Sequence, residues 1–288
     1  MNGKITVAIL AIIIMSSVTG YLAYNGAFSI NNASTANRVE LRVFIASSLT
    51  NVVANMTSTF EKDNNCKLVV NSGSSSALYA QITSGSPCDV FMSADTKWTK
   101  QLNNSGLLLG NNYSNFTTNS LEVILSQGNP QGITSLADLA KPGVKLVFAD
   151  PSIPSGSYTN ITIWKIDQTW GKIGNPAFAD AGEYKNYNFT VHQNVVSYET
   201  TAENVVGKVS LNVGTADAGI AFVSDAVYGN MTGAQVQFLP IPADLNTRGT
   251  YGIGVIGTTS QSALAQKFVD FWTSTQGQTL LTQFGFNS

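Results

Sequence analysis

Apolar residues follow two spacings in the first part of the chain. Residues 41–45, 67–70 and 89–92 are short, mostly apolar runs of the kind that form buried strands. Each run is followed by a short polar segment, and apolar residues then return three or four positions apart, which indicates a helix. The helix after the first run has the longest such stripe: Leu49, Val52, Val53, Met56 and Phe60. A strand, a polar turn and a helix, repeated three times, predict a parallel sheet with crossover helices.

The rest of the chain repeats this arrangement with more variation. Strands are predicted at residues 121–125, 145–150, 191–196, 218–223, 236–241 and 250–256. Helices are predicted at residues 134–140, 157–170 and 201–209, and in a last segment that carries Leu264, Phe268, Phe271 and Trp272.

Two lobes are the natural way to organise this alternation of strands and helices. We expect lobe I to contain residues 41–120 and 256–288, and lobe II to contain residues 121–255, with hinges near residues 119–121 and 252–255. Each lobe is expected to be an α/β unit, a mostly parallel sheet flanked by helices. Ligands of such sheets bind beyond the carboxyl ends of the strands, so a ligand would occupy the crevice between the lobes.

Residues 1–37 differ in character from the remainder. Residues 5–24 are uncharged, mostly apolar and preceded by Lys4, and they are long enough to cross a bilayer. They are equally consistent with a secretory signal that is cleaved between residues 25 and 36. A retained anchor or a cleaved signal, followed by a polar linker, would place the rest of the chain outside the cytoplasm, at the cell surface or in a periplasm.

Two further features fit an exported chain. Eight Asn-x-Ser/Thr sequons are present, although a chain rich in Asn, Ser and Thr also forms them by chance. They begin at Asn32, Asn55, Asn103, Asn112, Asn115, Asn160, Asn188 and Asn230. In an oxidising compartment we favour a disulfide between Cys66 and Cys88 over two buried thiols.

Charge and reactive side chains argue against several classes of function. Charged residues make up 11% of the chain and the formal net charge is -2, so no surface for nucleic acid is expected. The single histidine, His192, falls in a predicted strand, and no G-x-S-x-G motif is present, so we do not expect an enzyme. One histidine and two well-separated cysteines provide no cluster of metal ligands.

Three polar turns carry the candidate chemistry. They are ASSLT at residues 46–50, SGSSSA at residues 72–77 and SIPSGSYT at residues 152–159, and none contains Arg, Lys, Asp or Glu. Each offers hydroxyls and the free N–H groups of a helix start, where anions bind. Ser and Thr at a helix start are also common as N-caps alone. If the three turns meet in one crevice, their neutral donors suit a fully ionised oxyanion, and a lining without carboxylates excludes a ligand that carries a proton.

Five longer segments contain these turns and their neighbours: ASSLTNV, SSSALYAQI, SPCDVFMSADTKW, DPSIPSGSYT and AENVVGKVSLNVGTADAGIAFVSDA. Together and in this order, between about residues 41 and 286, they resemble the molybdate-binding proteins of ABC transporters, which have the type II periplasmic binding-protein fold. The resemblance implies a monomeric extracytoplasmic protein that binds molybdate, and also tungstate, as a ligand. It also implies delivery of the anion to an ABC permease in the membrane, without a cofactor or a protein-bound metal cation.

The resemblance further implies which residues hold the anion. The hydroxyls of Ser48 and Ser75 would come from lobe I, and the N–H groups of Ser155 and Val205 from lobe II. The family's remaining ligand is a tyrosine hydroxyl, and this chain has Phe222 at that position, which cannot donate a hydrogen bond. We expect the side chain of Ser155, where the family often has alanine, to compensate.

Two other functions stay open on the residues alone. The same donors would suit sulfate or phosphate, because the size of the cavity selects among oxyanions and the sequence does not display it. A surface glycoprotein with an adhesive role and no part in transport would also account for the anchor-like segment and the sequons. Amino-acid and carboxylate ligands are not expected, since the three turns lack the arginine that clamps a carboxylate.

Overall fold

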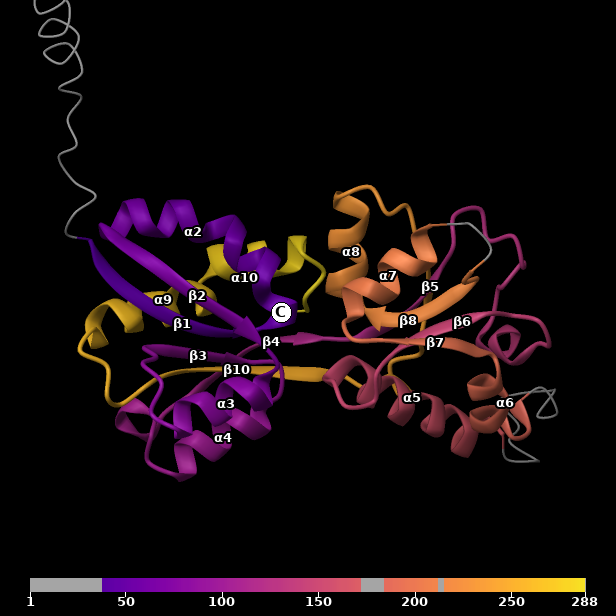
Figure 1. Cartoon of the computed structure of the whole chain (residues 1–288), viewed down its shortest axis with the longest axis horizontal. Coiled ribbons are helices and arrows are strands. Elements are labelled where there is room, and N and C mark those ends of the chain that lie inside the picture. The colour runs from indigo at the N-terminus through magenta and orange to yellow at the C-terminus, as the bar shows by residue number, and fades with distance from the viewer. Residues whose placement is uncertain (1–37, 172–183, 212–214, 288) are drawn as a thin grey trace, which may run out of the picture.

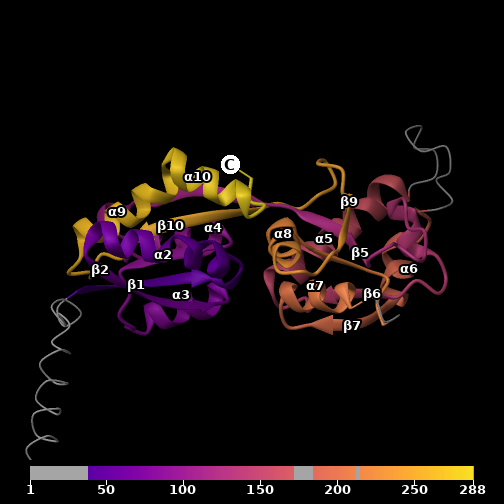
Figure 2. The same ribbon diagram turned by 90° about the horizontal axis from the view of Figure 1, so that it is seen from above.

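The computed structural model describes residues 38–171, 184–211 and 215–287. These residues form two lobes that lie side by side, each built on a five-stranded sheet (Figure 1, Figure 2). The two-lobed α/β fold predicted from the sequence is confirmed. The predicted signal or anchor segment, the linker and the sequon at Asn32 lie outside the described residues. Within the described ranges, no helix is both long enough and apolar enough to span a membrane.

The sheet of lobe I has the strand order β2-β1-β3-β10-β4. Its strands are β1 (Val39–Ala46), β2 (Cys66–Gly73), β3 (Val90–Ser93), β4 (Ser114–Asn119) and β10 (Gly249–Val255). Strand β1 runs parallel to β2 and β3, whereas β10 runs antiparallel to β3 and β4. The sheet is therefore mixed, and its parallel part holds the strands that precede the serine-bearing turns of this lobe.

Helices cover both faces of this sheet, because side chains alternate between its two sides. They are α2 (Thr50–Asn64), α3 (Ser75–Thr83), α4 (Thr96–Asn104), α9 (Ser262–Thr273) and α10 (Thr275–Gln283), with the short 3-10 turns η1 (Ser47–Leu49) and η2 (Leu109–Asn111). Helices α2, α9 and α10 pack on the face that bears Leu41 and Val43, and α3 and α4 pack on the opposite face, against Phe44. The predicted apolar stripe of α2 is buried in the first of these cores.

Lobe II repeats the same layering with the strand order β7-β6-β8-β5-β9. Its strands are β5 (Leu121–Leu125), β6 (Leu146–Ala149), β7 (Val195–Glu199), β8 (Ala218–Phe222) and β9 (Gln237–Pro240). Its helices are α5 (Pro154–Trp170), α6 (Tyr187–Gln193), α7 (Ala202–Ser210) and α8 (Val223–Met231), with the 3-10 turn η3 (Leu136–Ala140). Helices α5 and α6 pack with Phe148 on one face, and α7 and α8 pack with Val147 on the other.

Strand β10 corrects the predicted boundary between the lobes. It pairs with β3 and β4, so residues 249–255 belong to the sheet of lobe I and not to lobe II. Two segments therefore link the sheets, residues 119–121 and residues 240–249. The apolar pattern of residues 250–256 predicts a strand correctly, but it does not reveal which sheet the strand joins, because that depends on pairing with distant residues.

Five further elements also differ from the sequence prediction. Helix α6 extends to Gln193, so His192 is helical and the predicted strand at residues 191–196 begins only at Val195. Tyr187 and Val191 are buried four residues apart, which is the helical period that the prediction overlooked. Strand β4 and helix α8 were not predicted at all, and α5 begins at Pro154, three residues earlier than expected.

The predicted disulfide is absent, since Cys66 and Cys88 are both free and buried. Cys66 begins β2, and Cys88 lies just before β3, on the opposite side of β1. Neighbouring strands are about 4.8 Å apart, so two strands separated by a third are about 10 Å apart. A disulfide needs Cα atoms within about 7 Å, so this topology keeps the two thiols apart.

Candidate functional site

A cavity of about 270 Å³ lies between the two lobes. Its walls follow the carboxyl ends of β1, β2 and β3 in lobe I and of β6, β7 and β8 in lobe II. The lining residues are Ala46, Ser47, Ser48, Gly73, Ser74, Ser75, Ala94, Ile153, Pro154, Ser155, Thr200, Thr201, Ala202, Glu203, Phe222 and Asp225. The three polar turns predicted from the sequence therefore meet at one place.

Ser48 lies in η1, between the end of β1 and the start of α2. Its hydroxyl oxygen is 2.8 Å from that of Tyr251, which is fully buried on β10. The side-chain amide of Asn119 donates to the Tyr251 hydroxyl at 3.4 Å and to the Ser224 hydroxyl at 2.8 Å. Because Tyr251 accepts from Asn119, its own proton is available for Ser48, and the Ser48 proton is left for a ligand.

Ser75 is the first residue of α3 and is only 2% exposed. Its Oγ accepts a hydrogen bond from the N–H of Ala94 at 3.0 Å, which ties α3 to the end of β3. The capping role at this helix is filled by Ser74, whose hydroxyl accepts from the N–H of Ala77. A hydroxyl that accepts a hydrogen bond keeps its own proton for another partner, so Ser75 can donate into the cavity.

Ser155 is the second residue of α5, directly after Pro154. Proline suits the first helical position, where an N–H has no partner in the helix, so Ser155 and Gly156 provide the first free N–H groups. The Ser155 side chain is buried, and its Oγ has no hydrogen-bond partner among the described residues. Gly156 is needed because a Cβ there would lie 2.1 Å from the carbonyl oxygen of Asp150. The start of α5 thus presents N–H groups and an unsatisfied hydroxyl.

The start of α7 reaches the cavity, but Val205 does not line it. The Val205 side chain is buried, and its N–H donates to the carbonyl oxygen of Thr201 at 3.4 Å within the helix. The Thr201 hydroxyl caps the helix by accepting from the N–H of Asn204 at 3.1 Å. The N–H groups that α7 leaves free are therefore those of Ala202 and Glu203, and both residues line the cavity.

Phe222 ends β8 and lines the cavity at the position that the resemblance implies. Its ring is 3% exposed and packs edge-on against Tyr158, with 6.0 Å between ring centroids. The Tyr158 hydroxyl is directed elsewhere, since it donates to the Asp95 carboxylate of lobe I at 3.5 Å. Burial, followed by the charge of Asp95, raises the pKa of Tyr158 to about 12. Neither aromatic ring supplies the hydroxyl that Phe222 lacks.

Two carboxyl groups also line the cavity, those of Glu203 and Asp225, so the predicted lining without carboxylates is wrong. Glu203 is exposed and accepts a hydrogen bond from the side-chain amide of Asn51 at 3.1 Å, across the two lobes. Asp225 lies in the first turn of α8 and is 6% exposed. Burial, followed by the charge of Glu203, raises the pKa of Asp225 to about 8. The sequence prediction missed this helix start, although the triplet Ser-Asp-Ala directly after a predicted strand is typical of one.

The described lining of the cavity contains neither lysine nor arginine. In the part of the chain that the structure covers, no group of three or more His, Cys, Asp or Glu side chains is arranged to hold a metal ion. The donors available to an anion are therefore hydroxyls and the N–H groups of helix starts.

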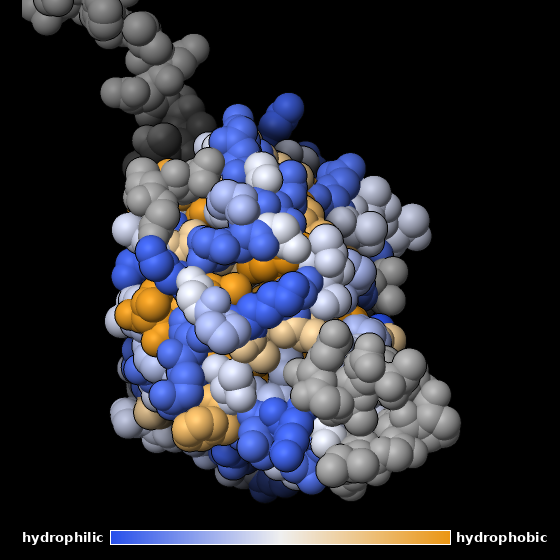
Figure 3. Space-filling model, turned by 90° about the vertical axis from the view of Figure 1, so that its right-hand side faces the viewer, coloured by the Kyte–Doolittle hydropathy of each residue, from blue (hydrophilic) through white to orange (hydrophobic). Residues whose placement is uncertain are grey.

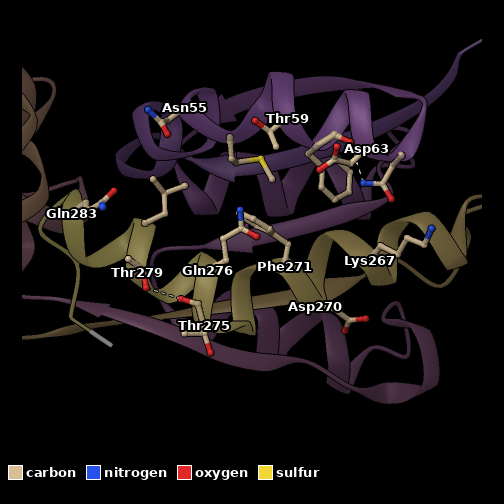
Figure 4. A pocket seen from close by; sticks show the side chains of 14 residues that line it. Asn55, Thr59, Asp63, Lys267, Asp270, Phe271, Thr275, Gln276, Thr279 and Gln283 are labelled. Atoms are coloured by element: carbon tan, nitrogen blue, oxygen red, sulfur yellow. Dashed lines mark hydrogen bonds between the residues drawn. The ribbon is translucent and has the colours of Figure 1, made fainter.

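A larger hollow of about 850 Å³ lies on lobe I, between α2 and the α9–α10 pair (Figure 4). Amide and hydroxyl side chains surround Phe271 there, and the charged side chains of Asp63, Lys267 and Asp270 lie toward one end. None of the site residues predicted from the sequence lines this hollow. It is also formed by helix faces and not by strand ends, so the cavity between the lobes is the better candidate for a ligand site.

The outer end of lobe II is mostly hydrophilic, with apolar side chains in separate patches (Figure 3). His192 belongs to α6 of this lobe. Its Nδ1 is 2.7 Å from the carbonyl oxygen of Asn188, and its Nε2 is 3.1 Å from the side-chain oxygen of Asn160. Both ring nitrogens are thus occupied by structural contacts, and His192 does not line the cavity.

Comparisons with known proteins agree with this architecture. Residues 41–287 match the family described as bacterial extracellular solute-binding protein. The molybdate-binding protein ModA of Mycobacterium bovis is 36% identical over 212 residues, which cover 74% of this chain and 70% of that protein.

Two solved structures share the fold at lower identity. The periplasmic molybdate-binding protein of Azotobacter vinelandii has a TM-score of 0.67 at 20% identity, covering 86% of this chain and 99% of that chain. The sulfate-binding protein SubI of Mycobacterium tuberculosis H37Rv has a TM-score of 0.67 at 17% identity, covering 86% of each chain. The fold, the position of the cavity and the match over residues 41–287 together show that this chain belongs to the family of bacterial extracellular solute-binding proteins.

Proposed function

We propose that this chain captures molybdate, and tungstate as a second ligand, between its lobes and delivers the anion to an ABC permease in the membrane. The observation that carries the proposal is the convergence of Ser48, Ser75 and Ser155 on one cavity whose described lining has no cationic side chain. Neutral O–H and N–H donors at helix starts can hold a dianion without a formal positive charge. The 36% identical relative, whose name gives molybdate as its ligand, supports the choice among oxyanions.

Each lobe has a distinct part in this proposal. Ser48 and Ser75 donate from lobe I, and Ser155 and the first N–H groups of α7 donate from lobe II. An anion that contacts both lobes favours their closed arrangement, because only that arrangement completes its set of donors. The closed form is then the one that the permease recognises.

Binding and release, without catalysis, are sufficient for this role, and a monomer is sufficient to provide the cavity. The protein would act outside the cytoplasm, with residues 5–24 serving as a retained anchor or a cleaved signal. The family supports the location outside the cytoplasm, and the apolar sequence of residues 5–24 supports the anchor or signal.

Isothermal titration of the purified chain with molybdate, tungstate, sulfate and phosphate tests the proposal. We expect tight binding of the first two, and a loss of about tenfold or more in affinity in Ser48→Ala, since an anion loses a direct donor. Ser58→Ala, an exposed change in α2, is the matched control and should bind as the wild type does. Absence of binding to any of the four anions would reject the oxyanion site and favour a surface glycoprotein without a transport role.

One observation favours phosphate as an alternative ligand of the same site. Glu203 lines the cavity, and an ionised carboxylate can accept a hydrogen bond from hydrogen phosphate, which molybdate at neutral pH cannot offer. Tight binding of phosphate with weak binding of molybdate would therefore replace the proposed ligand while keeping the proposed site.

A further inference from the structure

Asp225 is the one buried acid in the described lining of the cavity, and its carboxyl group lacks a full set of partners. Its Oδ2 makes no hydrogen bond with any described residue. The Ser155 Oγ, on the same cavity, is likewise unsatisfied. Two buried polar atoms without partners, from α5 and α8, therefore belong to residues that line the cavity proposed for an anion. Such atoms are rare in folded proteins and call for an explanation.

The charges around Asp225 do not favour a carboxylate. Glu203, on α7, adds a second negative charge to the same cavity, and the nearby Tyr251, on β10, is a buried neutral hydroxyl. Helix α2 contributes the neutral side chain of Asn51, which binds Glu203. The start of α8 carries a partial positive charge that favours ionisation, but burial and Glu203 outweigh it and raise the pKa of Asp225 to about 8.

A bound dianion would make ionisation of Asp225 still less favourable. Two like charges within one desolvated cavity repel each other, and the proton that removes this repulsion can sit on the carboxyl group. A neutral carboxyl group is then also a hydrogen-bond donor. Phe222 and Asp225 lie three residues apart at the junction of β8 and α8, and both line the cavity.

We propose that Asp225 is the neutral acid in the anion-bound protein and donates a hydrogen bond to an oxygen of the oxyanion, on the wall where Phe222 lacks a hydroxyl. Capture of one dianion is thereby coupled to the binding of one proton whenever Asp225 is ionised beforehand. This inference rests on the proposed function and adds a pH-dependent donor to the same site.

The coupling has a defined direction. Below the pKa of Asp225 the site is already protonated, and the affinity for molybdate does not change with pH. Above that pKa only the protonated fraction binds, so the apparent dissociation constant rises about tenfold for each further pH unit. Because the pKa of Asp225 is about 8, release of the anion is favoured by an alkaline environment and capture by a neutral or acidic one.

Titration calorimetry with molybdate at several values between about pH 6 and about pH 9 tests this proposal. At the upper end, repeating each titration in buffers with different heats of ionisation reports the number of protons taken up. We expect up to one proton per anion and weaker binding at high pH in the wild type. Asp225→Asn keeps an N–H donor but cannot titrate, so its affinity should be independent of pH and it should take up no proton. Asp63→Asn, an exposed change in α2, should behave as the wild type does.

The possible outcomes separate the two proposals. Molybdate binding that is equally tight across the pH range, with no proton taken up, would overturn the role of Asp225 and leave the proposed function intact. A wild-type pH profile retained in Asp225→Asn would assign the proton to another group and also overturn it. Tight binding of phosphate without proton uptake would mean that the ligand itself carries the proton, and it would overturn the role of Asp225 as the donor. No binding of any oxyanion at any pH would overturn both proposals.

Discussion

The two lobes contribute donors to the cavity in different states. In lobe I the hydroxyls of Ser48 and Ser75 are already hydrogen-bonded, to Tyr251 and to the N–H of Ala94. In lobe II the Ser155 Oγ and the Asp225 Oδ2 have no partner among the described residues. The two lobe I hydroxyls are therefore positioned before a ligand arrives, whereas lobe II keeps two polar groups that a ligand can satisfy.

This difference gives the anion a direct effect on lobe closure. An unsatisfied buried polar group costs about 1–3 kcal/mol, and an anion that supplies the missing partner recovers that free energy only when it touches lobe II. Binding to lobe I alone leaves the cost in place. The unsatisfied groups of lobe II thus favour the state in which both lobes contact the anion.

The largest effect is expected from Gly156→Ala in lobe II. A Cβ at this position would lie 2.1 Å from the carbonyl oxygen of Asp150 and 2.4 Å from that of Ala149, so the start of α5 must shift. We expect a loss of about 1–3 kcal/mol in the free energy of unfolding. We also expect more than about a hundredfold loss of oxyanion affinity, because the α5 donors move away together.

Thermal unfolding and calorimetry check this expectation. Gly207→Ala, in α7, is the matched control, since no atom lies within 4 Å of its added Cβ and alanine favours the helix. Equal affinities in Gly156→Ala and Gly207→Ala would mean that the start of α5 does not hold the anion.

Ser75→Ala tests the organised half of the site. The change removes a donor to the anion and also leaves the N–H of Ala94 without its acceptor. Affinity should fall by about 1.5–3 kcal/mol, and the free energy of unfolding should fall as well. Ser76→Ala, at the exposed neighbouring position, is the control. Unchanged stability in Ser75→Ala would contradict the view that lobe I is organised in advance.

Tyr251→Phe tests the same half through a residue that does not line the cavity. The ring remains, but Ser48 loses its partner and the amide of Asn119 loses one acceptor. We expect about tenfold weaker binding, equivalent to about 1.4 kcal/mol, because Ser48 is no longer held in a donating orientation. Tyr198→Phe, at an exposed position on β7, controls for the loss of a phenol. If the two variants bind equally well, Tyr251 does not position Ser48.

The fold and the meeting of the three polar turns were accessible from local sequence patterns, whereas the five individual residues were implied by the resemblance. Strand and helix periods predict both lobes, and the carboxyl ends of parallel strands share one edge, which brings Ser48 and Ser75 together with Ser155 across the crevice. Phe222 also reaches the cavity at its implied position. Val205 does not, because a helix leaves free the N–H groups of its first residues and Val205 already bonds to Thr201.

The residues that were missed depend on contacts between distant parts of the chain. Ser48 and Tyr251 are 203 positions apart, and Asn119 and Tyr251 are 132 apart, so no local period links them. Asn119 ends β4, whose sequence SNFTTN has few apolar residues and gives no clear strand pattern. Asp225 was missed for a different reason, since α8 follows β8 without an intervening turn and the acid sits at that junction.

Ser155→Ala is expected to have the smallest effect and the most informative sign. In the free protein the Ser155 Oγ is buried without a partner, so its removal should raise the free energy of unfolding by about 1 kcal/mol. In the complex the same hydroxyl would donate to the anion, so affinity should fall by about fivefold, with the N–H donor retained. Ser157→Ala, in the same helix turn but outside the lining, should change neither quantity.

The two variants therefore distinguish the lobes. Ser75→Ala should lower both the stability of the free protein and its affinity, whereas Ser155→Ala should raise the stability and lower the affinity. Thermal unfolding of both variants with and without molybdate measures the two quantities in one experiment, since a ligand that binds only the folded protein raises its midpoint by an amount that grows with the logarithm of its affinity. Unchanged affinity in Ser155→Ala would show that this side chain does not replace the hydroxyl absent from Phe222. The remaining candidates for the compensation would then be a water molecule and Asp225, the other unsatisfied group among the lining residues of lobe II.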